Sequence, residues 1–161
     1  LSLHDALPIS IPGGHGGQLL GSQLQWLDDQ LALRPQAPTV LILHHPPFIS
    51  GIGHMDRERF INAAALETVV ARHPQVERLL CGHLHRSMQR RFGGSLSCVC
   101  PGTSHQIVLD LQDAAPAHFN LEPAGYLLHR WDAQQGLVSH NGVFGDYPGP
   151  YPFYDAHGLI D

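Results

Sequence analysis

Long hydrophobic runs and basic residues are both scarce in this sequence. A membrane-spanning helix needs about 20 consecutive apolar residues, and no stretch of the 161 residues approaches that length. Nine Lys plus Arg stand against fourteen Asp plus Glu, which gives a formal net charge of -5. A protein that binds nucleic-acid phosphates normally carries a basic patch. We therefore expect no membrane-spanning segment and no nucleic-acid polymer as a partner.

Cysteine is also rare, and its pattern excludes a disulfide framework. Cys81, Cys98 and Cys100 are an odd number without the spacing of a disulfide-rich secreted domain. The start of the chain lacks the basic flank of a signal peptide. Because unpaired cysteines are commonly buried in protein cores, we expect three reduced thiols in a cytoplasmic protein. A hydrophobic content of 43% is sufficient for one globular domain with a sizeable core.

Two apolar runs each end in histidine, and they carry the strongest functional signal. The first run, at 39–43, is followed by His-His-Pro-Pro at 44–47, and the two prolines cannot continue a strand. The second, at 79–81, is followed by Gly-His-Leu-His at 82–85, whose two histidines would point to the same side of an extended segment. A segment of helical length between the runs predicts a β-α-β unit. Because ligands gather at the carboxyl edge of such sheets, these histidines indicate a metal site.

The rest of the sequence changes from a helical period to an alternating one. Leucines at helical spacing predict a helix over about 22–33, and we expect Asp56 to cap a second helix that runs to about Arg72. From residue 86 onward the alternation predicts a run of short strands, over 88–92, 96–99, 106–111, 126–131 and 137–144. We therefore expect an α/β fold, in which a β-α-β unit is followed by a mostly antiparallel strand meander in a second sheet.

The two histidine motifs and their order resemble those of the calcineurin-like metallophosphoesterases. Within that superfamily the chain most resembles the class III cyclic nucleotide phosphodiesterases and the related bacterial glycerophosphodiesterases. Three further segments carry this resemblance, at 101–106, 128–130 and 149–150. It covers roughly residues 12–154. The resemblance implies a two-sheet α-β-β-α sandwich, with the sheets face to face and the helices outside.

The resemblance also implies hydrolysis of a small-molecule phosphodiester by two divalent metal ions. The resemblance implies that His44 and His83 would bind one ion and His85 the other. His44 is chosen over His45 because the family ligand is the histidine with a proline two residues later. His45 and His105 are expected beside the substrate, with plain packing as an equal alternative for His45. Manganese, iron, zinc and cobalt all accept mixed imidazole and carboxylate ligands, so the metal is not distinguished.

Three family motifs that should precede this region are absent: Asp-x-His, Gly-Asp-x-x-Asp and Gly-Asn-His. A bridging aspartate, an asparagine ligand and the histidine that assists the leaving group would belong to them, so the catalytic residues are expected upstream of this chain. Three neutral imidazoles do not balance two dications, and a single catalytic zinc ion usually has three protein ligands. We expect a longer parent hydrolase, and residues 11–161 would form the C-terminal part of its single domain. This fragment alone is expected to be inactive. Residues 1–10 resemble a translated sequencing adapter and are expected to be non-native.

Three other interpretations remain open. The histidines of 82–85 could be ordinary polar loop residues, although the second histidine motif, at 44–47, disfavours this interpretation. We keep the interpretation of ordinary polar residues for the histidines at 54, 73, 118, 129, 140 and 157. The Pro-Gly and aromatic tail at 145–154 suggests instead a non-catalytic oligomerisation or regulatory module, and thus a homo-oligomer formed through the tail. An amidohydrolase barrel also uses His-x-His, but a barrel keeps alternating helices and strands, whereas strands follow one another after residue 85.

Overall fold

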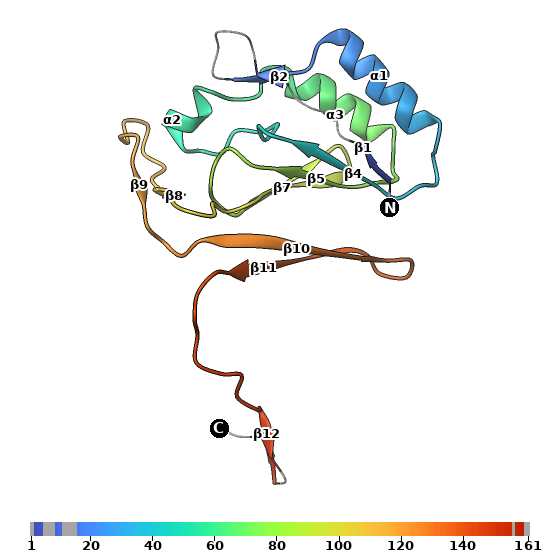
Figure 1. Cartoon of the computed structure of the whole chain (residues 1–161). Coiled ribbons are helices and arrows are strands. Elements are labelled where there is room, and N and C mark those ends of the chain that lie inside the picture. The colour runs from blue at the N-terminus through green and yellow to red at the C-terminus, as the bar shows by residue number, and fades with distance from the viewer. Residues whose placement is uncertain (1, 5–8, 11–15, 156, 160–161) are drawn as a thin grey trace.

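The computed structural model describes residues 2–4, 9–10, 16–155 and 157–159. At its centre lies a five-stranded sheet with the order β1-β4-β5-β7-β6 (Figure 1). Three parallel strands form its middle: β4 (Thr39–Leu43), β5 (Val76–Cys81) and β7 (Ser95–Val99). β1 (Ser2–His4) lies parallel beside β4, and β6 (Met88–Phe92) is the antiparallel edge. The carboxyl ends of β4 and β5 therefore meet at one edge of the sheet.

Two helices, α1 (Gly21–Ala32) and α3 (Ala63–Ala71), cover one face of this sheet (Figure 1). Their buried side chains are Leu27 and Leu31 on α1, and Leu66, Val69 and Val70 on α3. These apolar faces join the side chains of the central strands in one core, and such packing supplies most of a short helix's stability. The expected helix over 22–33 is confirmed, with its bounds moved by one residue.

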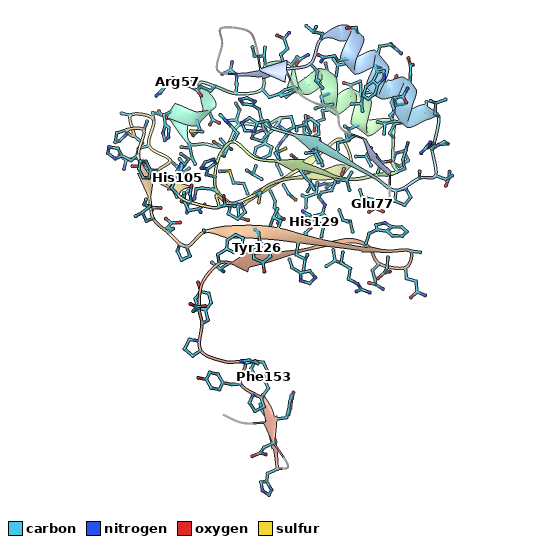
Figure 2. All side chains as sticks on the ribbon, viewed as in Figure 1. Arg57, Glu77, His105, Tyr126, His129 and Phe153 are labelled. Carbon is cyan, nitrogen blue, oxygen red and sulfur yellow. The ribbon has the colours of Figure 1, made fainter. Side chains whose placement is uncertain are left out.

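A long hairpin, β10 (Gly125–Asp132) and β11 (Gly136–Val143), lies against the opposite face of the sheet (Figure 1). Its contacts are partly polar. Arg78 of β5 donates to the Leu137 carbonyl oxygen at 2.9 Å, and the Trp131 indole N–H donates to Glu77 at 3.1 Å. Glu77 lies at this junction of sheet and hairpin in Figure 2. The result is a mixed α/β fold of helix, sheet and hairpin layers.

The remaining elements are short. They are α2 (Gly53–Asp56) and three two-stranded pairs: β2 (Ile9–Ser10) with β3 (Gly17–Gln18), β8 (Gln106–Ile107) with β9 (Phe119–Asn120), and β12 (Tyr154–Asp155) with β13 (Gly158–Leu159). Among the residues that the structure describes, no helix has both the length and the hydropathy needed to cross a membrane. All three cysteines are free, and Cys81 and Cys98 are buried.

The expected start of the second helix at Asp56 is wrong, because α3 begins only at Ala63. Asp56 ends α2, and its carboxylate accepts hydrogen bonds from the preceding loop: from the N–H and hydroxyl of Ser50 at 2.8 and 2.9 Å and from the N–H of Gly51 at 2.8 Å. Residues 59–61 instead bond to Gly17, since the Ile61 N–H donates to its carbonyl oxygen at 2.8 Å. Because residues 59–61 are bonded to Gly17, the helix begins only after them, at Ala63.

The expectation that the strand meander after residue 86 lies in a second sheet is wrong for β6 and β7. β6 and β7 join the first sheet as a hairpin, and β7 pairs in parallel with β5. Gly93 and Gly94 make the turn with φ of 58° and 87°, a conformation that favours glycine. Phe92 and Val99 are completely buried in the core, which holds the hairpin there. The strand expected over 106–111 spans only β8, and the α-β-β-α sandwich stays a prediction.

Residues 1–10 were expected to lie outside the native fold. The structure places Ser2–His4 in β1 beside β4 and Ile9–Ser10 in β2 beside β3. Such pairing does not establish the origin of these residues, so their assignment as non-native stays a prediction.

Candidate metal centre

Three histidines converge where β4 and β5 end. His44 and His45 follow β4 directly, and His83 follows β5 after one glycine. The two strands are in register there, with Leu43 opposite Cys81, and the Gly82 N–H donates to the His44 carbonyl oxygen at 3.0 Å. One potential ligand atom from each of the three imidazoles lies within 4.8 Å of the other two. This spacing is small enough for all three to reach one ion.

His45 is the most buried member of this cluster, with only 4% of its surface exposed. Its ring centroid lies 4.1 Å from that of His83 and 4.9 Å from that of His44. Gly17 packs against its other side, where an added Cβ would come within 2.9 Å of the His45 Cβ. The sequence predicted a substrate-facing role for His45; that role stays a prediction, and the structure adds that His45 can reach the same ion as His44 and His83.

His83 has the features of a metal ligand. Its Nε2 is buried and has no hydrogen-bond partner among the described residues, although buried polar atoms normally have one. Burial, and to a lesser extent the neighbouring His45, His44 and His85, lower its pKa to about 4. The imidazole is therefore neutral at pH 7, which is the form that binds metals. A divalent cation would satisfy the orphaned nitrogen.

The backbone at these histidines differs from the extended segment that the sequence predicted. His83 and His85 have φ of 67° and 46°, and the Leu84 N–H donates back to the Gly82 carbonyl oxygen at 2.7 Å. Left-handed backbone at non-glycine residues is uncommon and tends to occur at functional sites. The turn brings the His83 ring to the cluster at 44 and 45 and the His85 ring to His105. Leu84 is 2% exposed and packs into the core.

His85 forms a second group with His105. Its Nδ1 lies 3.1 Å from the His105 Nε2, and the His105 Nδ1 lies 3.0 Å from the Ser104 hydroxyl. If the His85 Nδ1 carries the proton and donates a hydrogen bond to the His105 Nε2, the His85 Nε2 is left free for an ion. Burial lowers the pKa of His85, with His105 as the next cause, so this ring is also neutral at pH 7. The sequence predicted His105 beside the substrate, and that role stays a prediction. The contact between His105 and His85 could not be predicted, because no pattern in the nearby sequence indicates it.

These groups fit metal binding, but they do not complete a two-ion centre. The cluster found among the described residues consists of imidazoles alone. Neutral imidazoles suit zinc and iron, whereas carboxylates are needed to bridge two ions and offset their charge. The histidines at 44, 45 and 83 could therefore hold one ion, and the single imidazole of His85 needs further ligands for another.

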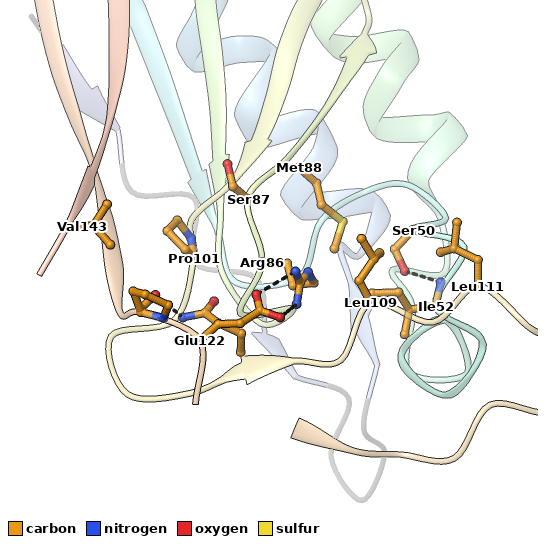
Figure 3. A pocket seen from close by; sticks show the side chains of 12 residues that line it. Ser50, Ile52, Arg86, Ser87, Met88, Pro101, Leu109, Leu111, Glu122 and Val143 are labelled. Atoms are coloured by element: carbon orange, nitrogen blue, oxygen red, sulfur yellow. Dashed lines mark hydrogen bonds and ion pairs between the residues drawn. The ribbon is translucent and has the colours of Figure 1, made fainter. Parts of the chain in front are cut away.

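A pocket of about 520 Å³ (Figure 3) has Arg86 and Gln106 in its lining, and these two residues directly follow His85 and His105 in the sequence. Arg86 crosses it and pairs with Glu122 at 2.9 Å, while also donating to the Ile107 carbonyl oxygen. Its walls are mostly apolar and include Ile52, Met88, Pro101, Leu109, Leu111 and Val143. No local sequence pattern marks Arg86 or Glu122, since their pairing depends on a loop fold that brings residues 36 positions apart together.

Without metal, the chain is expected to lose stability as the pH falls from about 6.5 towards 4. The folded-state pKa values of His83, His85 and His129 are lowered, mainly by burial, while the unfolded chain has ordinary histidines with a pKa of about 6.5. The unfolded state thus binds protons first, so the stability is complete above about pH 6.5 and declines below it. Thermal unfolding of the metal-free chain from pH 7.5 to 4.5 measures this. His129→Gln should flatten the slope, and an unfolding temperature independent of pH would contradict the prediction.

Comparison with known proteins gives several similar sequences, although no protein-family model matches. The chain is 39% identical over 157 residues to the probable glycerophosphodiester phosphodiesterase GpdQ of Arcobacter nitrofigilis, covering 96% of this chain and 58% of that protein. It is 31% identical over 148 residues to glycerophosphodiester phosphodiesterase GpdQ of Enterobacter lignolyticus, covering 92% and 52%. Over 90 residues it is 39% identical to the 3',5'-cyclic adenosine monophosphate phosphodiesterase CpdA of Escherichia coli K12, covering 56% and 33%.

Among solved structures, a dimetal phosphatase from Danio rerio matches 53% of this chain and 28% of its own, with 24% identity and a TM-score of 0.46. The chain spans about half the length of the two glycerophosphodiester phosphodiesterases that it matches. Its predicted resemblance to glycerophosphodiester and cyclic nucleotide phosphodiesterases is confirmed by these relatives.

Proposed function

We propose that this chain is the C-terminal part of a calcineurin-like metallophosphoesterase whose complete form hydrolyses phosphodiesters with two divalent metal ions. The observation that carries the proposal is the convergence of His44, His45 and His83, with the buried Nε2 of His83 unpaired, at the carboxyl edge of β4 and β5. The names of the relatives, glycerophosphodiester and cyclic nucleotide phosphodiesterases, support the reaction type.

In this proposal each histidine group has one task. His44 and His83 hold the first ion, with His45 in reach of the same position, and His85 offers its Nε2 to the second. His105 accepts a hydrogen bond from the protonated His85 Nδ1 and so fixes which nitrogen faces the ion. Bound divalent ions supply Lewis-acid stabilisation of the phosphoryl charge and activate a water nucleophile. The partly buried, neutral rings of His83 and His85 hold these positions without needing to lose a proton at pH 7.

The proposal requires residues beyond this chain. The cluster brings no negative charge to the ions, and the expected bridging aspartate and leaving-group histidine belong to motifs that are absent here. We infer that the 161 residues alone are inactive. The substrate of the longer protein would be a small phosphodiester, either a glycerophosphodiester or a cyclic nucleotide, and we place the protein in the cytoplasm because its three thiols are free.

The test is to express the longest open reading frame that contains this sequence and to assay hydrolysis of bis(4-nitrophenyl) phosphate. We expect activity with added Mn²⁺, loss of activity on chelation, and no activity from the 161-residue chain. Activity on amides and none on phosphodiesters would replace the proposal by the amidohydrolase alternative. A reading frame that begins at this chain would also contradict it.

A second candidate function rests on the C-terminal tail, which extends away from the body below the hairpin (Figure 1). Its aromatic side chains are 61–76% exposed, at Tyr147, Tyr151, Phe153 and Tyr154. Phe153 projects from this segment in Figure 2. Large exposed apolar groups of this kind mark protein interaction sites. The tail could therefore join two copies of the chain, as in a non-catalytic oligomerisation module.

Removal of residues 145–161 is expected to convert an oligomer to a monomer if this second function is correct. None of the tail residues that the structure describes belongs to the buried core, so the truncated chain should keep its fold. Light scattering of both chains at equal concentration measures the mass, and circular dichroism checks the fold. A monomeric mass for both chains would eliminate the tail as an assembly device.

A further inference from the structure

The loop at 101–106 presses directly on His85. Its Gly102 lies so close that an added Cβ would come within 3.1 Å of the His85 Cβ and would overlap the carbonyl oxygen of His105. The same loop presents the His105 ring, whose Nε2 lies 3.1 Å from the His85 Nδ1. The orientation of His85 therefore depends on where this loop is held.

One buried side chain, Gln106, holds the loop. It is only 4% exposed, and its amide turns back on the loop: Oε1 accepts from the Gly102 N–H at 3.0 Å, and Nε2 donates to the Gly102 carbonyl oxygen at 2.8 Å. A third bond, from Nε2 to the Pro123 carbonyl oxygen at 3.4 Å, ties the loop to the segment before β10. The Gly125 N–H also donates to the Gly102 carbonyl oxygen, at 3.0 Å. Gln106 thus supplies the acceptor for the Gly102 N–H, and it shares the Gly102 carbonyl oxygen with the Gly125 N–H.

We propose that Gln106 is a positioning residue for the candidate metal centre, which acts by fixing the 101–106 loop so that His105 holds the His85 ring with its Nε2 towards the ion. This inference deepens the proposed function and rests on it for the identity of the ligand. An apolar side chain at 106 would leave the Gly102 N–H buried and unpaired, and the loop would have to move to find a partner for it. His105 sits inside the loop and would move with it.

The physical reason that this matters for metal binding is the role of the second nitrogen of a ligating histidine. A partner on that nitrogen selects the tautomer and ring orientation that bind the ion, and its loss typically weakens metal binding about 10–100-fold. Gln106 touches neither His85 nor an ion, so its effect must pass through Gly102 and His105. A glutamine that served only the packing of β8 would leave both the tautomer and the metal affinity of His85 unchanged.

The experiment compares the full 161-residue chain with Gln106→Met, which keeps the size but removes the amide, and with Gln106→Glu, which keeps an acceptor for the Gly102 N–H. Gln75→Met is the matched control, because Gln75 lies just before β5, at the opposite end of this strand from Gly82 and His83, and its amide donates to the Leu31 carbonyl oxygen of α1. Long-range ¹H–¹⁵N spectra report which ring nitrogen of His85 carries the proton. Titration with Zn²⁺, followed on the same ring signals, reports binding at His85.

We expect the wild-type chain and Gln75→Met to show His85 protonated on Nδ1 alone. Gln106→Met should give a mixture of tautomers and about 10–100-fold weaker Zn²⁺ binding at His85, and Gln106→Glu should fall between. If Gln106→Met does not fold, Gln106→Glu carries the test, since it loses the donors to Gly102 and Pro123. An unchanged His85 tautomer in the variants would overturn the inference. Absence of Zn²⁺ binding in the wild type would contradict the proposed function, while the tautomer would still decide the role of Gln106.

Discussion

Replacing His83 by alanine is expected to abolish metal binding at the three-histidine cluster. The His83 ring lies 4.1 Å from the His45 ring and 5.2 Å from the His44 ring. It also carries the buried nitrogen that has no partner among the described residues. Loss of a ligand should exceed the roughly 10–100-fold loss of affinity caused by losing an outer partner. Titration of the chain with Co²⁺, followed by visible absorption, measures the change.

Two further variants make this result specific. His140→Ala removes an exposed histidine from the hairpin and should leave Co²⁺ binding unchanged. His83→Gly removes the same ligand at a position with φ of 67°, where glycine is unstrained, and so separates loss of the ligand from backbone strain. In the longer protein, His83→Ala should also remove Mn²⁺-dependent hydrolysis. Unaltered Co²⁺ affinity in both His83 variants would show that the cluster is not a metal site.

The sequence was most informative where local chemistry decides the structure. Thr39–Leu43 is a strand with the expected bounds because an apolar run meets two prolines that cannot extend the ladder. The run before Gly82 is likewise a strand, and the parallel pairing of the two strands follows from the helical segment between them. The meeting of His44 and His83 at one edge could therefore be predicted without any knowledge of the side-chain geometry.

Prediction failed where contacts between distant residues decide the structure. Asp56 has the composition of a helix N-cap, but Asn62 precedes the helix instead, and its side-chain amide bonds to both backbone groups of Leu19. His105 is 20 residues from His85 in the sequence, and only the folding of the loop around Gly102 brings the two rings together. The positive φ of His83 likewise has no signal in a motif that reads as an extended strand.

A second large effect is expected in the loop around Gly102. Gly102→Ala should lower the free energy of unfolding by about 3 kcal/mol, near the upper end of the usual cost of overpacking. The new Cβ would overlap the carbonyl oxygen of His105, which is backbone, and would press on the Cβ of His85. Neither atom can rotate away, so the loop itself must shift and the contact between His85 and His105 must lengthen. Denaturant unfolding of the chain measures the free energy, and the His85 tautomer reports the shift.

Gly142→Ala is the matched control, because an added Cβ there overlaps another group just as closely but with a different consequence. Its neighbour is the ring of Tyr126, which is 40% exposed and can rotate into solvent. Alanine also loses less conformational entropy than glycine in a strand, so the free energy of unfolding should change by no more than about 0.5 kcal/mol. Equal destabilisation by both substitutions would mean that the Gly102 loop is no more constrained than the hairpin surface. A large difference, with the His85 tautomer altered only in Gly102→Ala, would show that close backbone packing around this loop sets the geometry of the second histidine group.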